Sequence, residues 1–158
     1  YKEYTKDIKE AFISGKSYCL AGAHGLGKTL YGTCVLKKAA DKGYTCLYTT
    51  LSDVVHALTK APQNEVYLAR KELITCDYIM IDEFDNRFMS SDNSADLFAR
   101  TLENILRTRA NNKLPILMAT NSPNIINSLN GALKDSLDSL FNGYIETIPV
   151  LGKDFRKI

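Results

Sequence analysis

Residues 22–29 combine three glycines, a lysine and a threonine at the spacing of a phosphate-binding loop (P-loop). They read Gly-Ala-His-Gly-Leu-Gly-Lys-Thr and match G-x-x-x-x-G-K-[ST] at every fixed position. Glycines let the backbone curl so that several N–H groups point at one anion, and the N-terminus of a following helix adds positive charge. Lys28 would then reach the β- and γ-phosphates of a nucleotide, while Thr29 would place its hydroxyl on Mg²⁺. The predicted nucleotide-binding residues are Gly22, Ala23, His24, Gly25, Leu26, Gly27, Lys28, Thr29 and Leu30.

The segments on either side of this loop have the patterns that the motif requires. Residues 17–21 form an apolar run typical of a buried strand, and residues 30–42 have the pattern of a helix. An ordinary glycine-rich turn with a solvated lysine would not need this strand–loop–helix context. His24 occupies a variable position of the motif, so we expect it to face solvent rather than to contact phosphate.

Two adjacent acids, Asp82 and Glu83, follow the apolar run at residues 78–81. A buried strand of this kind delivers carboxylates to the carboxyl edge of a parallel sheet, where the P-loop also lies. Asp82 would hold Mg²⁺ directly or through water, and Glu83 would orient and polarise the water that attacks the γ-phosphate. The alternative is a solvated strand end, because apolar runs that end in acids are common. The P-loop upstream favours the functional interpretation.

A polar residue, Asn121, follows a second continuous apolar run that ends at Thr120. A strand placed between the P-loop strand and the acidic strand would bring Asn121 within reach of the γ-phosphate. Asn121 could then hydrogen-bond that phosphate or the attacking water. An asparagine before Ser122 and Pro123 is equally a good start for a turn. Together with the other motifs, the position favours a role in sensing the γ-phosphate.

Strand-like and helical patterns alternate along the whole chain, which predicts an α/β fold with a central parallel five-stranded sheet and helices on both faces. Pro62 interrupts what would otherwise be one long helix, and Ser52 is a candidate N-cap. The polar stretch at residues 85–93 follows the third strand, at the edge where ligands bind in such sheets. The predicted strands cover residues 17–22, 45–50, 78–82, 115–120 and 144–150, and the predicted helices cover residues 4–14, 28–42, 53–60, 64–75, 95–110 and 124–141.

Efficient phosphoryl transfer often uses an additional arginine that stabilises the transition state. A basic residue in the last turn of a helix also interacts favourably with the helix dipole. The interaction with the helix dipole and a catalytic role therefore explain Arg107 and Arg109 equally well. The candidates for a finger or a second sensor are Arg100, Arg107, Arg109, Lys134 and Arg156.

Length, composition and charge limit the remaining possibilities. The chain has 158 residues, of which 45% are hydrophobic, and this suits a single globular domain. Its net charge of +2 predicts no strong non-specific attraction to nucleic acid or anionic membrane. No apolar stretch approaches membrane-spanning length, the first ten residues do not resemble a signal peptide, and the four cysteines form no C-x-x-C pair. We therefore expect a cytoplasmic protein with reduced thiols and no membrane association.

Two further stretches of sequence narrow the family to which these motifs point. Residues 109–115 read Arg-Ala-Asn-Asn-Lys-Leu-Pro, and residues 152–156 read Gly-Lys-Asp-Phe-Arg. In this order and spacing, the chain resembles the AAA+ ATPases of the DnaC/DnaI helicase-loader and IstB group over nearly its whole length. The resemblance implies a P-loop NTPase of AAA+ type that binds ATP and Mg²⁺, associates side by side with other copies, and engages single-stranded DNA and a replicative helicase. Because the chain begins at Tyr1, we expect residues 1–158 to be an AAA+ core that lacks an N-terminal partner-binding domain.

The resemblance leaves several alternatives open. Relatives usually carry an arginine finger near residues 133–140, where this chain offers only Lys134, a point charge without the guanidinium fork. A nucleotide-dependent assembly switch that hydrolyses ATP poorly is therefore an alternative, as is an IstB-like transposition helper. A small nucleoside or nucleotide kinase fits less well, because the Asp82–Glu83 pair suits water activation. Basic residues that could contact DNA phosphates, although a solvated helix face is favoured, are Lys60, Arg70 and Lys71.

Overall fold

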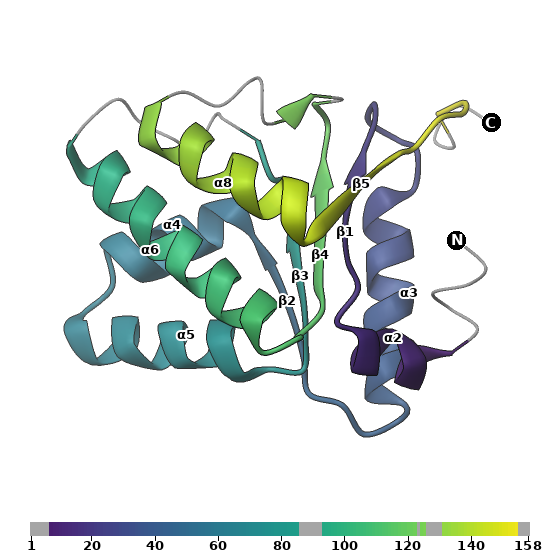
Figure 1. Cartoon of the computed structure of the whole chain (residues 1–158), viewed down its shortest axis with the longest axis horizontal. Coiled ribbons are helices and arrows are strands. Elements are labelled where there is room, and N and C mark those ends of the chain that lie inside the picture. Colours follow the sequence, from purple (N-terminus) through teal and green to yellow (C-terminus); the bar gives the residue numbers. More distant parts are fainter. Residues whose placement is uncertain (1–6, 86–92, 123, 126–130, 155–158) are drawn as a thin grey trace.

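Five parallel strands form one sheet at the centre of the molecule (Figure 1). A computed structural model of the chain describes residues 7–85, 93–122, 124–125 and 131–154. The strand order is β2-β3-β4-β1-β5, and every neighbouring pair is parallel. The sheet predicted from the sequence is therefore confirmed, with strand ends that differ by one residue at most. The strands are β1 (Ser17–Ala21), β2 (Cys46–Thr50), β3 (Tyr78–Asp82), β4 (Ile116–Thr120) and β5 (Ile145–Pro149).

Helices cover both faces of this sheet, as predicted. The face with α2 and α3 has its own apolar cluster, and a larger cluster lies beneath α4, α5, α6 and α8 on the other face. Parts of the helices predicted over residues 4–14 and 124–141, namely residues 4–6 and 126–130, lie outside the described residues. The helices are α2 (Ile8–Ser14), α3 (Lys28–Ala40), α4 (Leu51–Thr59), α5 (Gln63–Thr75), α6 (Asn93–Asn111) and α8 (Gly131–Gly143).

The alternation of side chains along β3 decides which face carries its final acid. Tyr78 and Met80 pack toward α2 and α3, whereas Ile79 and Ile81 pack into the other cluster. Both sets are buried, which explains why the strand is continuously apolar rather than alternating. Because side chains repeat every two residues in a strand, Asp82 follows Met80 on the face of α3. This is the helix that the P-loop leads into.

Local signals set the boundaries of the helices between β2 and β3. α4 ends at Thr59 and α5 begins at Gln63, so Pro62 separates them as predicted. The predicted N-cap at Ser52 is wrong, because α4 begins one residue earlier, at Leu51. Thr50 is the N-cap, and its Oγ1 accepts the N–H of Asp53 at 3.1 Å and donates to the Asp53 carboxylate at 2.7 Å.

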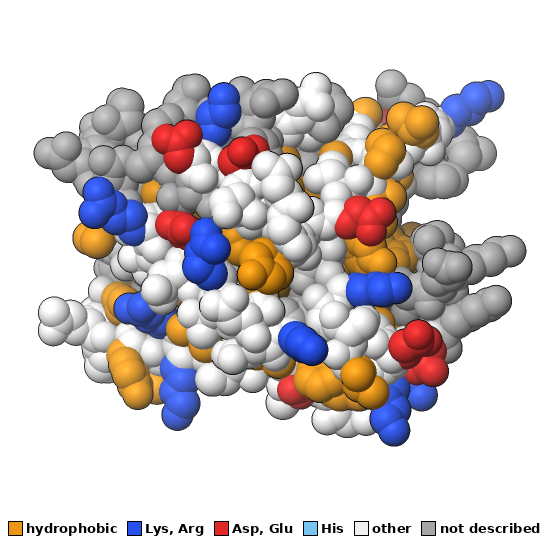
Figure 2. All heavy atoms as spheres, in the orientation of Figure 1, with side chains coloured by type: hydrophobic (Ala, Val, Ile, Leu, Met, Phe, Trp, Pro, Cys, Tyr) orange, Lys and Arg blue, Asp and Glu red, His pale blue; other side chains and the backbone are white. Residues whose placement is uncertain are grey.

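The edge strand β5 is less covered than the central strands. Ile145 is buried, but Glu146, Thr147 and Pro149 are exposed. On the face of the molecule shown in Figure 2, lysine and arginine side chains are interspersed with acidic ones rather than gathered in one patch. Among the described residues, no helix combines the length and the apolar composition needed to cross a bilayer.

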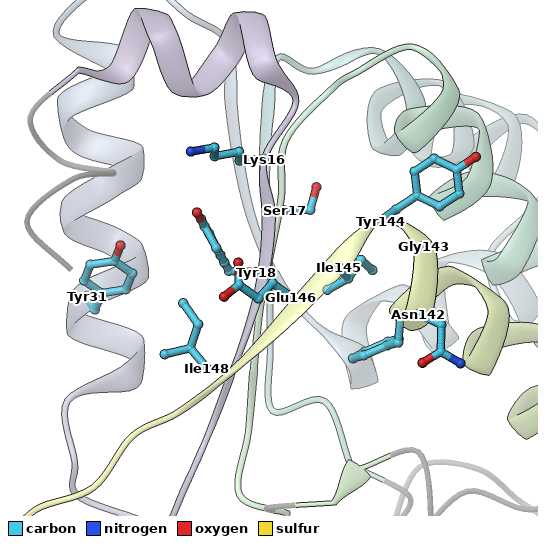
Figure 3. Close-up of a pocket in the computed structure, with 11 residues that line it drawn as sticks. Lys16, Ser17, Tyr18, Tyr31, Asn142, Gly143, Tyr144, Ile145, Glu146 and Ile148 are labelled. Carbon is cyan, nitrogen blue, oxygen red and sulfur yellow. The ribbon is translucent and has the colours of Figure 1, made fainter.

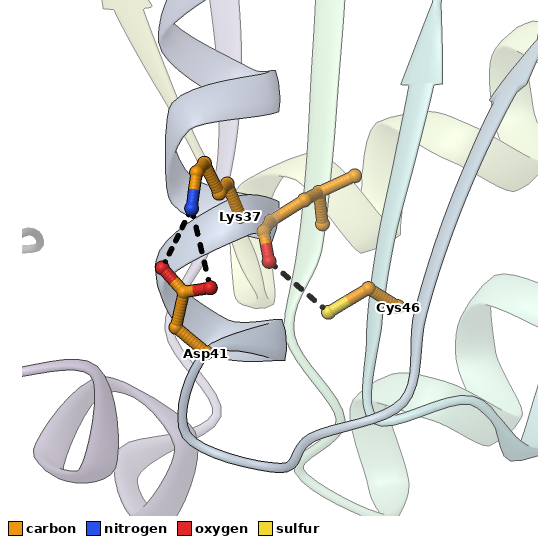
Figure 4. A network of polar contacts seen from close by, with 4 residues as sticks. Lys37, Asp41 and Cys46 are labelled. Carbon is orange, nitrogen blue, oxygen red and sulfur yellow. Dashed lines mark hydrogen bonds and ion pairs between the residues drawn. The ribbon is translucent and has the colours of Figure 1, made fainter.

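Polar contacts at the end of α3 join this helix to β2 (Figure 4). The Cys46 thiol donates to the carbonyl of Leu36 at 3.4 Å, and burial raises the pKa of that thiol. Lys37 forms an ion pair of 2.9 Å with Asp41, one turn further along the helix. Both partners are mostly exposed, so water and salt screen their attraction.

We expect Lys37→Ala to lower the free energy of unfolding by less than about 0.5 kcal/mol, as is usual for an exposed ion pair of this spacing. Urea denaturation of the wild type and the variant measures this difference. A loss several times larger would show that the ion pair stabilises the protein more than exposed pairs usually do.

Candidate functional site

The P-loop has the backbone conformation that its glycines predict. Gly25 and Gly27 have φ angles of +77° and +78°, which place both in the left-handed region that other residues adopt only with strain. Gly27 is the N-cap of α3, and no side chain caps this helix end. The N–H groups of the first turn are thus oriented for an anion, as at other helix N-termini that bind phosphate.

Lys28 connects the P-loop to the end of β4. Its side chain is buried, and Nζ donates to the carbonyls of Gly22 at 2.8 Å and Ala23 at 2.7 Å. It also donates to Oδ1 of Asn121 at 3.0 Å. β4 lies between β1 and β3, so Asn121 occupies the position between the P-loop strand and the acidic strand that the sequence analysis expected.

Asp82 is buried at the end of β3, and both of its carboxylate oxygens accept hydrogen bonds. The backbone N–H of Glu83 donates to Oδ1 at 2.8 Å, and the hydroxyl of Tyr48 donates to Oδ2 at 3.0 Å. Burial of the phenol, its hydrogen bond to Asp82 and the nearby carboxylates raise the pKa of Tyr48 to about 12. The hydroxyl therefore remains a donor at neutral pH. The sequence did not predict a role for Tyr48, because its position beside Asp82 follows only from the pairing of β2 with β3.

Close packing of α3 on β3 brings Thr29 and Asp82 to the same edge of the sheet. A Cβ atom at Gly32 would collide with Sδ of Met80, so the helix and the strand are in direct contact there. Thr29 lies about 4.5 Å nearer the N-terminus of α3 than Gly32, by the rise of a helix. Asp82 lies about 6.6 Å beyond Met80, by the rise of a strand. Thr29 and Asp82 therefore both lie on the P-loop side of the contact between Gly32 and Met80.

The backbone turns sharply at Glu83. Its φ of +51° is in the left-handed region, which is uncommon for a residue with a side chain. The following N–H, of Phe84, donates to the carbonyl of Ala119 at 2.8 Å, and the Phe84 ring is buried. These contacts hold the turn in place. As a result the Glu83 side chain is exposed, next to the buried Asp82.

The residues present fit a nucleotide with Mg²⁺. The P-loop offers N–H donors to phosphates, and the Lys28 ammonium group beside them would exchange one of the three hydrogen bonds described above for a phosphate oxygen. Thr29 and Asp82 are oxygen ligands of the kind that Mg²⁺ prefers. Mg²⁺ usually keeps several waters and binds through one or two protein groups plus phosphates, so a larger cluster of acids is unnecessary. When bound, this ion would neutralise charge on the phosphate oxygens.

The structure separates the remaining predicted residues into several groups. His24 is exposed, as expected, and so are Ala23 and Leu30. Of the basic candidates, Arg100 and Lys134 are exposed, whereas Arg107 forms an ion pair of 2.9 Å with Glu103 on its own helix. Arg156 and residues 86–92 of the polar stretch lie outside the described part of the chain.

Arg109 is not placed to act as a finger, so this candidate is wrong. Its side chain is fully buried, and its guanidinium donates to the carbonyls of Leu73 at 3.0 Å and Cys76 at 2.8 Å. It also donates to the carbonyls of Asp77 at 3.2 Å and Pro115 at 3.0 Å. Burial lowers the pKa of Arg109 from its ordinary value. The side chain therefore joins α6 to the segments that enter β3 and β4.

The described end of the chain packs against the P-loop. The N–H of Val150 donates to the carbonyl of Ala21 at 2.7 Å, and a Cβ atom at Gly22 would collide with the Val150 carbonyl. The carboxylate of Asp154 lies so close to Gly25 that a Cβ atom there would overlap it. Glycine at these two positions therefore permits close packing of the end of the chain on the P-loop.

A groove of about 730 Å³ lies between α3 and the edge strand β5 (Figure 3). Tyr18, Tyr31 and Ile148 contribute to its lining, together with the polar side chains of Lys16 and Glu146. None of residues 22–30 lines it, so this groove is distinct from the P-loop site.

The chain belongs to the AAA family, the ATPase family associated with various cellular activities, whose model matches residues 18–141. The matched stretch contains the P-loop, Asp82 and Asn121. Comparison with curated proteins gives no match for this sequence.

Several solved structures share the fold. A structure of the replication initiator DnaA bound to AMPPCP and single-stranded DNA is 20% identical, with a TM-score of 0.73 over 92% of this chain and 44% of that one. A crystal structure of DnaI is 15% identical, with a TM-score of 0.75 over 95% of this chain and 80% of DnaI. The DnaC helicase loader is 16% identical, with a TM-score of 0.67 over 95% and 85%. This chain thus spans less than half of the DnaA structure but most of the two others.

Proposed function

We propose that this chain is the Mg²⁺-dependent, ATP-binding and ATP-hydrolysing part of a DNA-replication helicase loader similar to DnaC and DnaI. The hydrogen bond of 3.0 Å between Lys28 and Asn121 carries the enzymatic part of this proposal. It joins the P-loop to the end of β4, next to the strand that ends in Asp82. A P-loop lysine, a polar sensor and an acid with a neighbouring glutamate are the parts that ATP hydrolysis needs.

Each residue has a distinct role in the proposal. The P-loop N–H groups and Lys28 bind the phosphates, while Thr29 and Asp82 hold Mg²⁺. Glu83, exposed beside the buried Asp82, accepts a hydrogen bond from the attacking water and orients it. Asn121 contacts the γ-phosphate or that water and so distinguishes ATP from ADP.

The loader part of the proposal is supported by fold and by sequence motifs. The similarity to DnaI and DnaC extends over most of those chains as well as most of this one. DnaA shares the fold and has been observed with single-stranded DNA and a nucleotide analogue. We therefore propose single-stranded DNA, a replicative helicase and further copies of the chain as partners, in the cytoplasm.

ATP turnover at increasing protein concentrations tests the enzymatic proposal. If a neighbouring copy completes the site, phosphate release per protomer should rise as the chain self-associates. Phosphate release from ATP without any acceptor nucleotide would also argue against a kinase. Nucleotide binding with no turnover at any concentration would contradict ATP hydrolysis.

That last outcome would support a second function, a nucleotide-dependent assembly switch. The observation that favours it is the use of two arginines for structure, since Arg109 is buried and Arg107 is paired with Glu103. Arg100 and Lys134 remain as exposed basic candidates among the described residues.

Retention of a replicative helicase by the tagged full-length protein tests the loader proposal. We expect purified helicase to be retained in a nucleotide-dependent manner, with ATP and ADP giving different amounts. Retention of a transposase instead would support the IstB-like alternative. Equal background retention with ATP, ADP and no nucleotide would contradict the loader function.

A further inference from the structure

The side chains of Tyr48 and Asp82 meet across two neighbouring strands. In the pairing of β2 with β3, Tyr48 is opposite Met80 and Thr50 is opposite Asp82. Tyr48 and Asp82 are therefore diagonal neighbours on the same face, a separation that a long aromatic side chain can bridge. The phenol does so, and its hydroxyl lies 3.0 Å from Oδ2 of Asp82.

We propose that Tyr48 is a positioning residue for the metal site, where its hydroxyl holds the Asp82 carboxylate in the orientation that serves Mg²⁺. This inference rests on the proposed binding of nucleotide with Mg²⁺. It concerns a residue outside the P-loop and outside the acidic strand, on the edge strand β2.

Two fixed donors determine the orientation of the Asp82 carboxylate. The Glu83 N–H holds Oδ1 at 2.8 Å from the backbone, and Tyr48 holds Oδ2 from the neighbouring strand. With a donor on each oxygen, rotation of the group would break a hydrogen bond. A carboxylate has about four lone-pair sites, so positions remain for the metal or its bound water. Partners of this kind orient metal ligands in other proteins and tune their affinity.

Competition of the hydroxyl with Mg²⁺ for Oδ2 would have the opposite effect. Removing the hydroxyl would then strengthen Mg²⁺ binding instead of weakening it. The sign of the change in Mg²⁺ dependence therefore separates positioning from competition. Loss of nucleotide binding in the absence of Mg²⁺ would indicate a third possibility, a general structural role.

Tyr48→Phe tests the proposal, because it keeps the ring and removes only the hydroxyl. A fluorescent ATP analogue is titrated into the wild type and the variant, first in excess EDTA and then over a series of Mg²⁺ concentrations. In EDTA we expect equal binding, because the hydroxyl that is removed donates to Asp82, a proposed ligand of the metal and not of the nucleotide. The Mg²⁺ concentration for half-maximal tightening should rise about threefold to tenfold, at or just below the usual cost of losing such a partner. Tyr144→Phe, with a similar exposure at the opposite edge of the sheet, is the control and should behave as wild type.

An unchanged or lowered Mg²⁺ midpoint in Tyr48→Phe would overturn the inference, as would an equal loss of binding in EDTA. A wild-type protein whose nucleotide binding ignores Mg²⁺ would overturn the proposed function together with the inference. If Mg²⁺ tightens nucleotide binding by the wild type and the Tyr48→Phe variant has the same Mg²⁺ midpoint, only the inference about Tyr48 would be overturned.

A double-mutant cycle tests whether Tyr48 acts through Asp82. In an Asp82→Asn background, the amide already disturbs the metal site, so Tyr48→Phe should add no further shift in the Mg²⁺ midpoint. A further shift as large as that in the wild-type background would show that Tyr48 acts by another route and would overturn the assignment.

Discussion

Replacing Arg109 by methionine is expected to lower the free energy of unfolding by about 3 kcal/mol or more. Methionine fills much of the same space but donates no hydrogen bond. The carbonyls of Leu73, Cys76, Asp77 and Pro115 would each lose a donor, and three of these four hydrogen bonds are buried. Only one partner of each hydrogen bond is removed, which is the costly case for a buried polar group. Chemical denaturation followed by circular dichroism measures the change.

Arg107→Met provides a matched control two residues away on the same helix. Its guanidinium is partly exposed and paired with Glu103 one turn earlier, so its loss should cost no more than about 0.5 kcal/mol. Equal losses for the two variants would contradict the role given to Arg109. Arg109→Lys distinguishes a structural role from a catalytic one. At temperatures where this variant is folded, we expect it to turn over ATP at the wild-type rate. If Arg109 were a transition-state finger, the variant would lose most of the activity.

Replacing Glu83 by glutamine is expected to reduce ATP turnover about 100-fold or more, because the amide can no longer accept a proton from the attacking water. Nucleotide affinity should change little. The change is isosteric, and Glu83 is exposed while the lysine of the P-loop is buried and hydrogen-bonded elsewhere. Phosphate release under saturating ATP and binding of a fluorescent ATP analogue measure the two quantities separately.

Glu146→Gln is the matched control for this experiment. Glu146 is also an exposed glutamate, but it lies on the edge strand β5 and lines the groove described above. It should leave both turnover and affinity unchanged. Wild-type turnover in Glu83→Gln would exclude Glu83 as the residue that activates water. A parallel loss of affinity would instead indicate damage to the phosphate site.

The fold was largely predictable because its signals are local. Apolar runs, the break at Pro62 and the P-loop glycines are each visible within a short window of sequence. The strand order also brings the P-loop, Asp82 and Asn121 to one edge, as the motifs required. Their chemical roles remain predictions.

Three features were not predictable, because each depends on contacts between distant segments. Arg109 has the position of a helix-terminal cation in the sequence, and only the packing of α6 on the entries to β3 and β4 shows it as a buried hydrogen-bond donor. Tyr48 has no motif around it, and its meeting with Asp82 follows from the pairing of β2 with β3. The left-handed backbone of Glu83 depends on the anchoring of Phe84 to β4. In each case the contact joins segments that are far apart in the sequence, so no short stretch of sequence reveals it.

Within the described part of the chain, no strand pairs with the outer edge of β5, and this affects how copies of the chain can assemble. A neighbouring protein could extend the sheet by adding a strand along β5, but this strand places a charge at Glu146 and ends in Pro149, which lacks an N–H. Both features discourage strand addition and the uncontrolled aggregation that it brings. If copies of this chain associate, as proposed above, we expect them to do so through helices and loops rather than through β5.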